Sequence, residues 1–292
     1  MATIASRCAP RDIRCGIGLR LPHMAEMVAV RPPVGWLEVH PENILANPHA
    51  QELVGDLAGT YLMSMHTVGV SIGSADGLDR EHLRRLRRLL DRIEPALVSG
   101  HLAWSSLDGT YLNDLLPLPY TDESLSVVAQ QLDEVQQALG REFIIENPSS
   151  YVHAAHSTMT EAEFLLALVA RTGCRLLCDV SNVFLSGHNM GYDPFRFIDQ
   201  IPAEAVVELH MGGFTAEEDP GNSGGTVLID THAAPGADGA WTLYRHAVSR
   251  FGAVPTIIEW DNDLPPLSRL VAEAATADQV CASARHAHAH AS

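Results

Sequence analysis

The stretch FIIEN, residues 143–147, is a short apolar run that ends on a carboxylate, and the same arrangement recurs along the chain. Short apolar runs bounded by turn residues are typical of strands buried on both faces, as in parallel sheets. A carboxylate or an imidazole is costly to bury alone, because it loses its hydration. Its repetition therefore indicates that these side chains converge on one site. The other runs are LMSMH ending at His66, ALVSGH at His101, LLCD at Asp179, VVELH at His210 and TIIE at Glu259.

Eight such runs alternate with helical patterns along the chain. Strict alternation of strands and helices is typical of βα units around a parallel sheet. Eight units predict an α/β fold with a single closed (β/α)8 TIM barrel, whereas six would have favoured an open doubly wound sheet. The predicted strands are residues 15–20, 35–40, 62–66, 96–104, 143–147, 175–180, 206–211 and 256–260.

The 292 residues fit one domain, because barrels of this size commonly form a single unit and no Pro-rich or Ser-rich linker divides the chain. We expect an N-terminal extension at 1–14, the barrel at 15–280 and a flexible, His-containing tail at 281–292. The longest irregular piece is 211–238, which we expect to be a functional loop because it carries Asp230 and His232.

The composition argues against several classes of partner. A formal charge of -17 disfavours binding to a nucleic-acid backbone, and the basic run EHLRRLRRLLDR (81–92) has the spacing of a solvated helix face. No run of about 18 apolar residues predicts a membrane span. The N-terminus has no apolar segment typical of a secretory signal, so a cytoplasmic location is expected. Five cysteines without a C-x-x-C pair give no disulfide framework.

The strand-end residues have the chemistry of a metal centre. In a (β/α)8 barrel the carboxyl ends of all strands open onto one face. Imidazoles suit iron, zinc or manganese, and carboxylates can bridge two ions. We therefore predict a multinuclear metal site, in which Glu146, Asp179 and His210 are also the candidate catalytic residues. The predicted ligands are His66, His101, Glu146, Asp179, Asn182, His210, Asp230, His232 and Glu259.

Further polar residues follow the predicted strands and could orient the substrate or the metal ligands. The segment WLEVHPEN (36–43) contributes four of them, including Glu38 and Glu42, and a structural role in turns is an open alternative for the whole set. The residues assigned to this role are His40, Asn43, Trp104, Asn147, His188 and Asp261.

A competing motif is Gly69-Val70-Ser71-Ile72-Gly73, which matches the G-x-S-x-G nucleophile elbow of serine hydrolases. That elbow requires a strand that leads straight into the turn and a helix that starts at once. Here the strand is expected to end at His66, and SADGLD separates the motif from the next helix. We therefore interpret the segment as a glycine-rich loop.

The order of the predicted ligands is similar to that of the trinuclear metal site in xylose-isomerase-like barrels, especially endonuclease IV, although Asn182 stands where that enzyme has a histidine. The surrounding segments resemble the multinuclear non-haem iron-dependent oxidative enzymes (MNIO), the MbnB-like family. The resemblance covers about residues 15–280 and rests on GIGLRLPHMAEM, GWLEVHPEN, SGHLAWS, LNDLLPLPYT, IIENPSSY, CDVSNVFLSGHN, VVELHMGG, LIDTHAAP and IIEWDNDLPPL.

This resemblance implies two or three iron ions, Fe(II) or Fe(III), with O2 as co-substrate. It implies oxidation of cysteine residues in a ribosomally made precursor peptide, which a separately encoded partner protein presents. The nine predicted ligands match the family's metal positions, and His188 lies in its S-x-H-N segment.

Two other functions remain open. One is a metal-dependent hydrolase or isomerase of the xylose-isomerase-like group, either an abasic-site endonuclease or a sugar isomerase. The negative charge and Asn182 weigh against the nuclease. The other is a metal-dependent scaffold or chaperone that holds a peptide without reacting with it.

Overall fold

The computed structural model describes residues 15–219, 221, 224–252 and 254–291, so the predicted N-terminal extension lies outside the described residues. Eight parallel strands close into a barrel in the order β1-β12-β9-β8-β7-β4-β3-β2. This confirms the predicted (β/α)8 fold. The barrel strands are β1 (Gly16–Gly18), β2 (Trp36–Val39), β3 (Leu62–Thr67), β4 (Leu97–His101), β7 (Ile144–Glu146), β8 (Leu176–Asp179), β9 (Val206–Gly212) and β12 (Thr256–Glu259).

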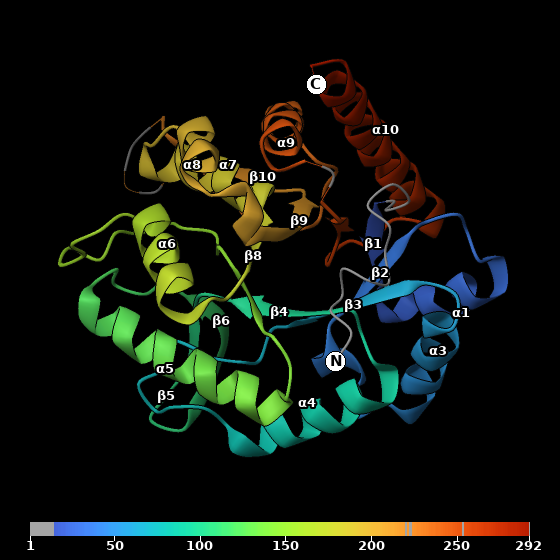
Figure 1. Cartoon of the computed structure of the whole chain (residues 1–292), viewed down its shortest axis with the longest axis horizontal. Helices are drawn as coiled ribbons and strands as arrows, with labels where there is room; N and C mark the ends of the chain where they lie inside the picture. The colour runs from blue at the N-terminus through green and yellow to red at the C-terminus, as the bar shows by residue number, and fades with distance from the viewer. Residues whose placement is uncertain (1–14, 220, 222–223, 253, 292) are drawn as a thin grey trace.

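Helices surround the barrel strands (Figure 1). Local signals set many of their ends. Thr160 and Glu163 form a capping box that starts α6, and Gly173 ends it in the left-handed conformation. The helices are α1 (Leu21–Val30), α2 (Pro41–Ile44), α3 (Pro48–Ala58), α4 (Arg80–Ile93), α5 (Asp122–Leu139), α6 (Glu161–Thr172), α7 (Val180–Met190), α8 (Pro194–Gln200), α9 (Asp238–Phe251) and α10 (Leu267–Ala291), with a 3-10 turn at Ala203–Ala205.

Alternation along the strands creates two layers inside the barrel. Five apolar side chains form a cluster separate from the main core: Trp36, Leu97, Ile144, Leu177 and Ile257. The residues two positions further along these strands are Glu38, Ser99, Glu146, Asp179 and Glu259. Because side chains two apart in a strand share a face, each strand contributes an apolar side chain below and a polar one above. The apolar layer closes the barrel beneath the polar layer.

Two antiparallel hairpins were not predicted. One joins β5 (Trp104–Leu107) to β6 (Thr110–Leu116), and the other joins β10 (Thr215–Glu218) to β11 (Thr226–Ile229). The strand predicted at 96–104 therefore ends at His101, and the expectation of an irregular loop at 211–238 is wrong where β10 and β11 lie. These strands are short and largely exposed, so they lack the apolar pattern that identifies a buried strand.

Helix α10 includes residues 281–291, which the sequence suggested as a flexible tail, and the boundary expected at residue 280 falls within it. Cys281 is buried, and its Sγ lies 3.3 Å from the hydroxyl of Tyr244 in α9. The start of that stretch therefore belongs to the packed core. Within the described part of the chain, no helix is both long and apolar enough to cross a membrane.

Candidate metal centre

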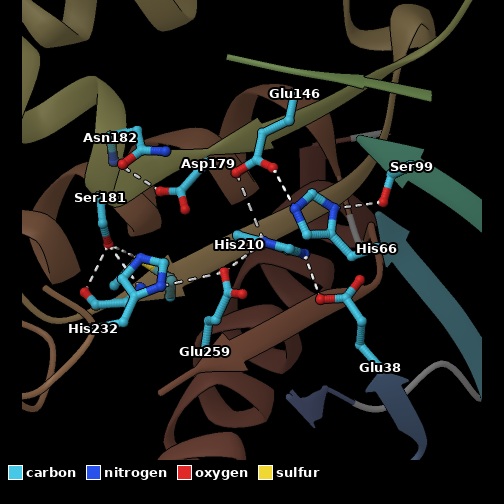
Figure 2. A network of polar contacts seen from close by, with 12 residues as sticks. Glu38, His66, Ser99, Glu146, Asp179, Ser181, Asn182, His210, His232 and Glu259 are labelled. Carbon is cyan, nitrogen blue, oxygen red and sulfur yellow. Dashed lines mark hydrogen bonds and ion pairs between the residues drawn. The ribbon is translucent and has the colours of Figure 1, made fainter. Parts of the chain in front are cut away.

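The polar side chains at the strand ends meet in a cavity of about 170 Å³ at the carboxyl end of the barrel. Asp179 and His210 are fully buried at its base, and Figure 2 shows both facing the other strand-end groups. Seven of the nine predicted ligands belong to three overlapping sets of donor atoms. The other two are Asp230, which contacts His232, and Asn182, which lines the cavity. The lining includes His40, His66, His101, Glu146, Asn182, Asp230, His232, Glu259 and Asp261.

The first donor set comes from three neighbouring strands, β3, β4 and β7. The Nε2 atoms of His66 and His101 lie 3.1 Å and 3.3 Å from Oε2 of Glu146, and 3.1 Å from each other. Nδ1 of His66 is hydrogen-bonded to the hydroxyl of Ser99 at 2.8 Å, which fixes the ring orientation. Three donor atoms therefore face one point, as ligands of a shared ion do.

The second set adds the end of β8 to Glu146 and His210. Asp179 caps helix α7, because its Oδ1 accepts the backbone N–H of Asn182 at 2.8 Å. The side chain of Asn147 bonds both the N–H and the C=O of Asp179, at 2.9 Å and 3.0 Å. Among the described residues, Asp179 Oδ2 and Asn182 Oδ1 have no hydrogen-bond partner, and Asn182 lines the cavity. The helix start thus presents two oxygen donors side by side.

The third set joins Asp179, His232 and Glu259. His232 lies in the segment after β11, with a left-handed φ of 44°. Its Nε2 is 2.9 Å from Oδ1 of Asp230, and its Nδ1 donates to Oδ2 of Asp261 at 3.0 Å. A Cβ on Gly212 would come within 2.5 Å of the His232 ring, so the close approach of β9 requires glycine there.

His210 connects the site to a deeper acidic layer. Its Nδ1 is 3.0 Å from Oε2 of Glu259, and its Nε2 is 3.2 Å from Oε1 of Glu38. Glu38 in turn accepts the hydroxyl of Ser64 at 2.9 Å. Glu208 is also fully buried, and its carboxylate lies close to Glu38 and His210. Such carboxylates orient an imidazole for binding a metal through its other nitrogen.

A buried cation completes the charge pattern, and the sequence interpretation missed it. Arg20 is only 5% exposed and donates to Oε1 of Glu259 at 2.8 Å, and it also contacts Asp261. His40 shares Oε1 of Glu259 at 3.1 Å. Arg20 is the last residue of the predicted strand GIGLR, so the rule that found the other residues would have identified it, had cations been considered.

Burial raises the pKa of the carboxylic acids at the site and lowers the pKa of two histidines. Desolvation raises the pKa of Glu146 to about 7 and that of Asp179 to about 7. Desolvation also lowers the pKa of His66 and of His101 to about 4, so both rings are neutral donors at neutral pH. For His210, burial opposes the charge, but Glu38 and Glu259 outweigh it and hold its pKa well above the usual range.

The donor set fits a multinuclear metal centre. Asp179 Oδ2 and Asn182 Oδ1 are buried and have no hydrogen-bond partner among the described residues. Glu146 Oε2 faces His66 and His101 as an ion pair, and Asp230 Oδ1 faces His232 Nε2 in the same way. Orphaned buried polar atoms are costly, so their gathering in one place indicates that cations satisfy them. Carboxylate, amide and imidazole donors suit iron, manganese or zinc.

Some of the residues predicted to orient substrate or ligands do lie at the cavity, while others do not. His40, Asn147 and Asp261 contact the ligand groups directly. Asn43 is exposed on α2, and Trp104 donates its indole N–H to the carbonyl of Pro117. His188 is exposed and bonds the carbonyl of Thr226 in β11. Position after a strand did not separate these two groups, because Asn43, Trp104 and His188 lie in α2, β5 and α7, whose contacts direct them elsewhere.

The competing serine has a structural contact. The hydroxyl of Ser71 accepts the backbone N–H of Ser105 at 2.7 Å, which ties the glycine-rich segment to β5. Glu42 also holds this loop, because it accepts the N–H of Gly69 at 3.0 Å. The same carboxylate contacts His82 in α4. Ser71 therefore has no arrangement of a nucleophile elbow, in agreement with its interpretation as a loop residue.

We expect metal affinity to fall steeply as the pH drops below 7. Glu146 and Asp179 each hold a proton below their raised pKa of about 7, and a bound ion must displace it. Each displaced proton costs about tenfold in affinity per pH unit, so these two add roughly 100-fold per unit to the slope that His210 and His232 already give. His66 and His101 do not contribute to the pH dependence of metal affinity above pH 5, because their pKa of about 4 keeps them neutral.

The measurement is calorimetric titration of metal-free protein with Zn²⁺ between pH 5.5 and 8, in two buffers of different ionisation enthalpy, to count released protons. His210 and His232 carry protons over the whole range, so the affinity keeps rising above pH 7, but less steeply. A proton release that does not increase below pH 7 would contradict the assignment of Glu146 and Asp179 as ligands.

Comparison with known proteins shows the family of this chain. Residues 14–282 match the family described as RiPP precursor modification enzyme MbnB/TglH/ChrH, where RiPP denotes a ribosomally synthesised and post-translationally modified peptide. The chain is 42% identical over 263 residues to a UPF0276 protein of Acaryochloris marina, covering 90% of this chain and 93% of that protein. It is 43% identical over 270 residues to a UPF0276 protein of Chromobacterium violaceum, covering 92% and 95%.

Solved structures show the same fold at low sequence identity. A xylose isomerase-like TIM barrel protein from Mycobacterium smegmatis, in complex with magnesium, has a TM-score of 0.64 at 13% identity, covering 95% of this chain and 99% of that one. An L-ribulose 3-epimerase has a TM-score of 0.60 at 15% identity, covering 96% and 98%. At these identities the likeness concerns the fold alone.

Proposed function

Because this chain belongs to the MbnB/TglH/ChrH family of RiPP precursor modification enzymes, we propose that it uses a multinuclear iron centre and O2 to oxidise cysteine in a precursor peptide. The nine strand-end residues would hold two or three ions. A separately encoded protein would present the peptide. The single observation that carries the metal assignment is the set of overlapping donor groups joined through Glu146 and Asp179.

The overlap of the donor groups supports more than one ion. Glu146 belongs both to the group with His66 and His101 and to the group with Asp179 and His210. Asp179 in turn belongs to the group with His232 and Glu259. A carboxylate offers two oxygens, so each shared residue can serve two ions at once and offset their repulsion. Bridged metal pairs are typically about 3.5–4 Å apart.

The donor chemistry supports a thiol substrate. All candidate ligands provide oxygen or nitrogen, and the four described cysteines are buried in the core, away from the cavity. Thiolate is a strong, soft ligand for iron, so the position for sulfur is left to the substrate. Iron, when bound, would supply the redox chemistry with O2 and would favour the thiolate form of the cysteine.

The protein's own residues would then position and insulate the reaction. His66 is oriented by Ser99, and Asp179 is fixed by Asn147 at both backbone groups. Arg20 and His40 both bind Oε1 of Glu259. Residues fixed in this way keep the ligand atoms in place when the substrate enters, which lowers the cost of reorganisation.

The test is mass spectrometry of small Cys-containing peptides encoded beside this gene, after aerobic incubation with the iron-loaded enzyme and its neighbouring partner protein. We expect oxidative loss of hydrogen at cysteine, and little reaction with free cysteine. A peptide positions its reacting group with binding energy from its other residues, which the free amino acid lacks.

Two controls sharpen this test. Ser71→Ala should keep turnover within a few-fold of the parent, because Ser71 only bonds a backbone N–H. Anaerobic Mössbauer spectroscopy should show at least two coupled irons. An unchanged peptide, together with cleavage of abasic DNA or isomerisation of a sugar in parallel assays, would overturn the proposal in favour of the hydrolase or isomerase.

A further inference from the structure

A second cavity, of about 850 Å³, adjoins the candidate metal centre and has no part in the proposed chemistry. Its wall is formed by residues 117–120, by residues 150–163 including the start of α6, and by the end of α7 with α8. It is five times as large as the cavity of about 170 Å³ that the metal ligands line. A space of this size can hold one long side chain of a ligand together with part of its backbone.

The wall of this cavity contains a buried carboxyl group without a partner. Glu161, the first residue of α6, is only 9% exposed and lines the cavity. No described residue forms a hydrogen bond or an ion pair with its side chain, and burial alone raises its pKa to about 8. The neighbouring Glu163 is the capping residue, so Glu161 is not needed to start the helix. A buried acid without a partner is costly, which points to a ligand that satisfies it.

Two tyrosines accompany Glu161 in the same wall. Tyr120 and Tyr192 line the same cavity as Glu161. Burial raises the pKa of both hydroxyls, and the charge of Glu161 raises it further. Phe164 packs against Tyr120 with ring centroids 5.1 Å apart, and Phe197 stacks on Tyr192 at 5.9 Å. The rings are therefore held in place from behind. A carboxylate beside aromatic faces is an environment that favours a desolvated ammonium or guanidinium group.

The cations of this wall lie further out. Arg196 and His153 line the cavity but are exposed. The buried part of the wall is acidic and aromatic, whereas the exposed part carries both signs, because Glu163 and Asp193 line it together with Arg196. A ligand whose long, basic side chain reaches the buried part fits this charge distribution, and an acidic one does not.

The two cavities share two segments of wall. Ser149 lines the metal cavity and Ser150 lines the second one. Leu115 lines the former and Pro117 the latter. Consecutive Cα atoms are about 3.8 Å apart, so the two openings lie within reach of a single short peptide. Exposed Tyr151 and Val152 extend the apolar surface beside this boundary.

We propose that the cavity at Glu161, Tyr120 and Tyr192 binds a lysine or arginine side chain of the peptide whose cysteine lies at the metal centre. This proposal rests on the proposed function for the identity of the ligand as a Cys-containing peptide. The site would recognise the substrate and set which cysteine enters, because the distance between the two cavities fixes the number of residues between the basic residue and the cysteine.

The test uses dye-labelled, N-acetylated peptides of glycine and serine with one cysteine and one variable residue placed one to five positions before or after it. The variable residue is lysine, arginine or norleucine, which has a similar length and no charge. Binding to the iron-loaded enzyme is measured anaerobically by fluorescence anisotropy. We expect the basic peptides to bind at least about tenfold more tightly than norleucine at one preferred spacing.

Glu161→Gln should abolish this preference, because it keeps the shape of the side chain but cannot lose a proton to become the carboxylate that pairs with a basic group. Its melting temperature should not fall, since an amide replaces a buried acid that has no partner. Tyr192→Leu should weaken the preference without affecting peptides that contain norleucine. Glu26→Gln is the matched control, because it makes the same change at an exposed residue of α1, far from the cavity. It should leave the preference intact.

Equal binding of lysine and norleucine peptides at every spacing, or a preference that persists in Glu161→Gln, would overturn the inference. The aerobic reaction of the same peptides, with the neighbouring partner protein added and followed by mass spectrometry, separates the two proposals. A preference that depends on Glu161 without any change at cysteine would refute the oxidative function and support the cavity's role. Cysteine oxidation that is insensitive to the basic residue and to Glu161 would support the oxidative function and refute the cavity's role.

Discussion

Glu146→Gln and Asp179→Asn are each expected to reduce peptide oxidation more than about 100-fold and to lower the iron content. Both residues belong to two donor groups, so under the proposed function each carboxylate would be shared by neighbouring ions. An amide has one acceptor oxygen and an NH2 group that only donates, so it cannot bridge. Loss of even an indirect support of a metal ligand typically costs about 10–100-fold, and loss of a bridge should exceed this.

The measurement combines metal analysis, Mössbauer spectroscopy and turnover on one peptide substrate. Glu26→Gln, which removes an equal charge from the exposed face of α1, should keep both metal and activity. Full iron content with unchanged coupling in either ligand variant would show that the carboxylate does not bridge. Loss of activity in Ser71→Ala alone, with metal retained, would revive a hydrolase mechanism.

Arg20→Met is expected to lower the free energy of unfolding of the metal-free protein by roughly 3–5 kcal/mol, the usual cost of leaving a buried charge without its partner. Arg20 and Glu259 are 5% and 4% exposed, so solvent does not replace the lost interaction. Asp261, the second partner of Arg20, is more exposed and should contribute less. Denaturant unfolding of metal-free and metal-loaded protein measures the difference.

Added metal should restore part of the lost free energy of unfolding, because a cation bound near Glu259 would supply the missing positive charge. Arg20→Lys should fall between the parent and Arg20→Met, since it keeps the charge but cannot reach Glu259 and Asp261 with one planar group. A metal-free Arg20→Met variant as stable as the parent would indicate that Glu259 takes up a proton at no cost. In that case Arg20 would not be needed to hold the site together.

The strand-end ligands could be predicted from the sequence because two local rules combine. A strand of period two aligns residues such as Ile144 and Glu146 on one face, and parallel strands place their carboxyl ends at one edge. Each of His66, His101 and Glu146 therefore reaches the same cavity without any knowledge of pairing. The assignment of these residues as metal ligands stays a prediction that the experiments above test.

The residues that lie beyond the strand ends could not be placed in this way. His188 and Asn43 follow strands in the sequence, yet one bonds the β10–β11 hairpin and the other is exposed on α2. The β5–β6 hairpin carried a usable signal, because Asp108 and Gly109 both have positive φ at its turn, as an Asp-Gly hairpin requires. The exposed strands on either side gave no apolar pattern to support it.

The sequence by itself determined the barrel, the face on which the site opens and most of the donor atoms, since each follows from the period of a strand and the order of strand ends. Only the tertiary structure decided the pairing of Arg20 with Glu259, the support of His210 by Glu38, and the burial of Glu161 beside two tyrosines. These contacts join segments up to 239 residues apart. Their distances depend on how the barrel closes and how its loops pack, and no local pattern encodes either.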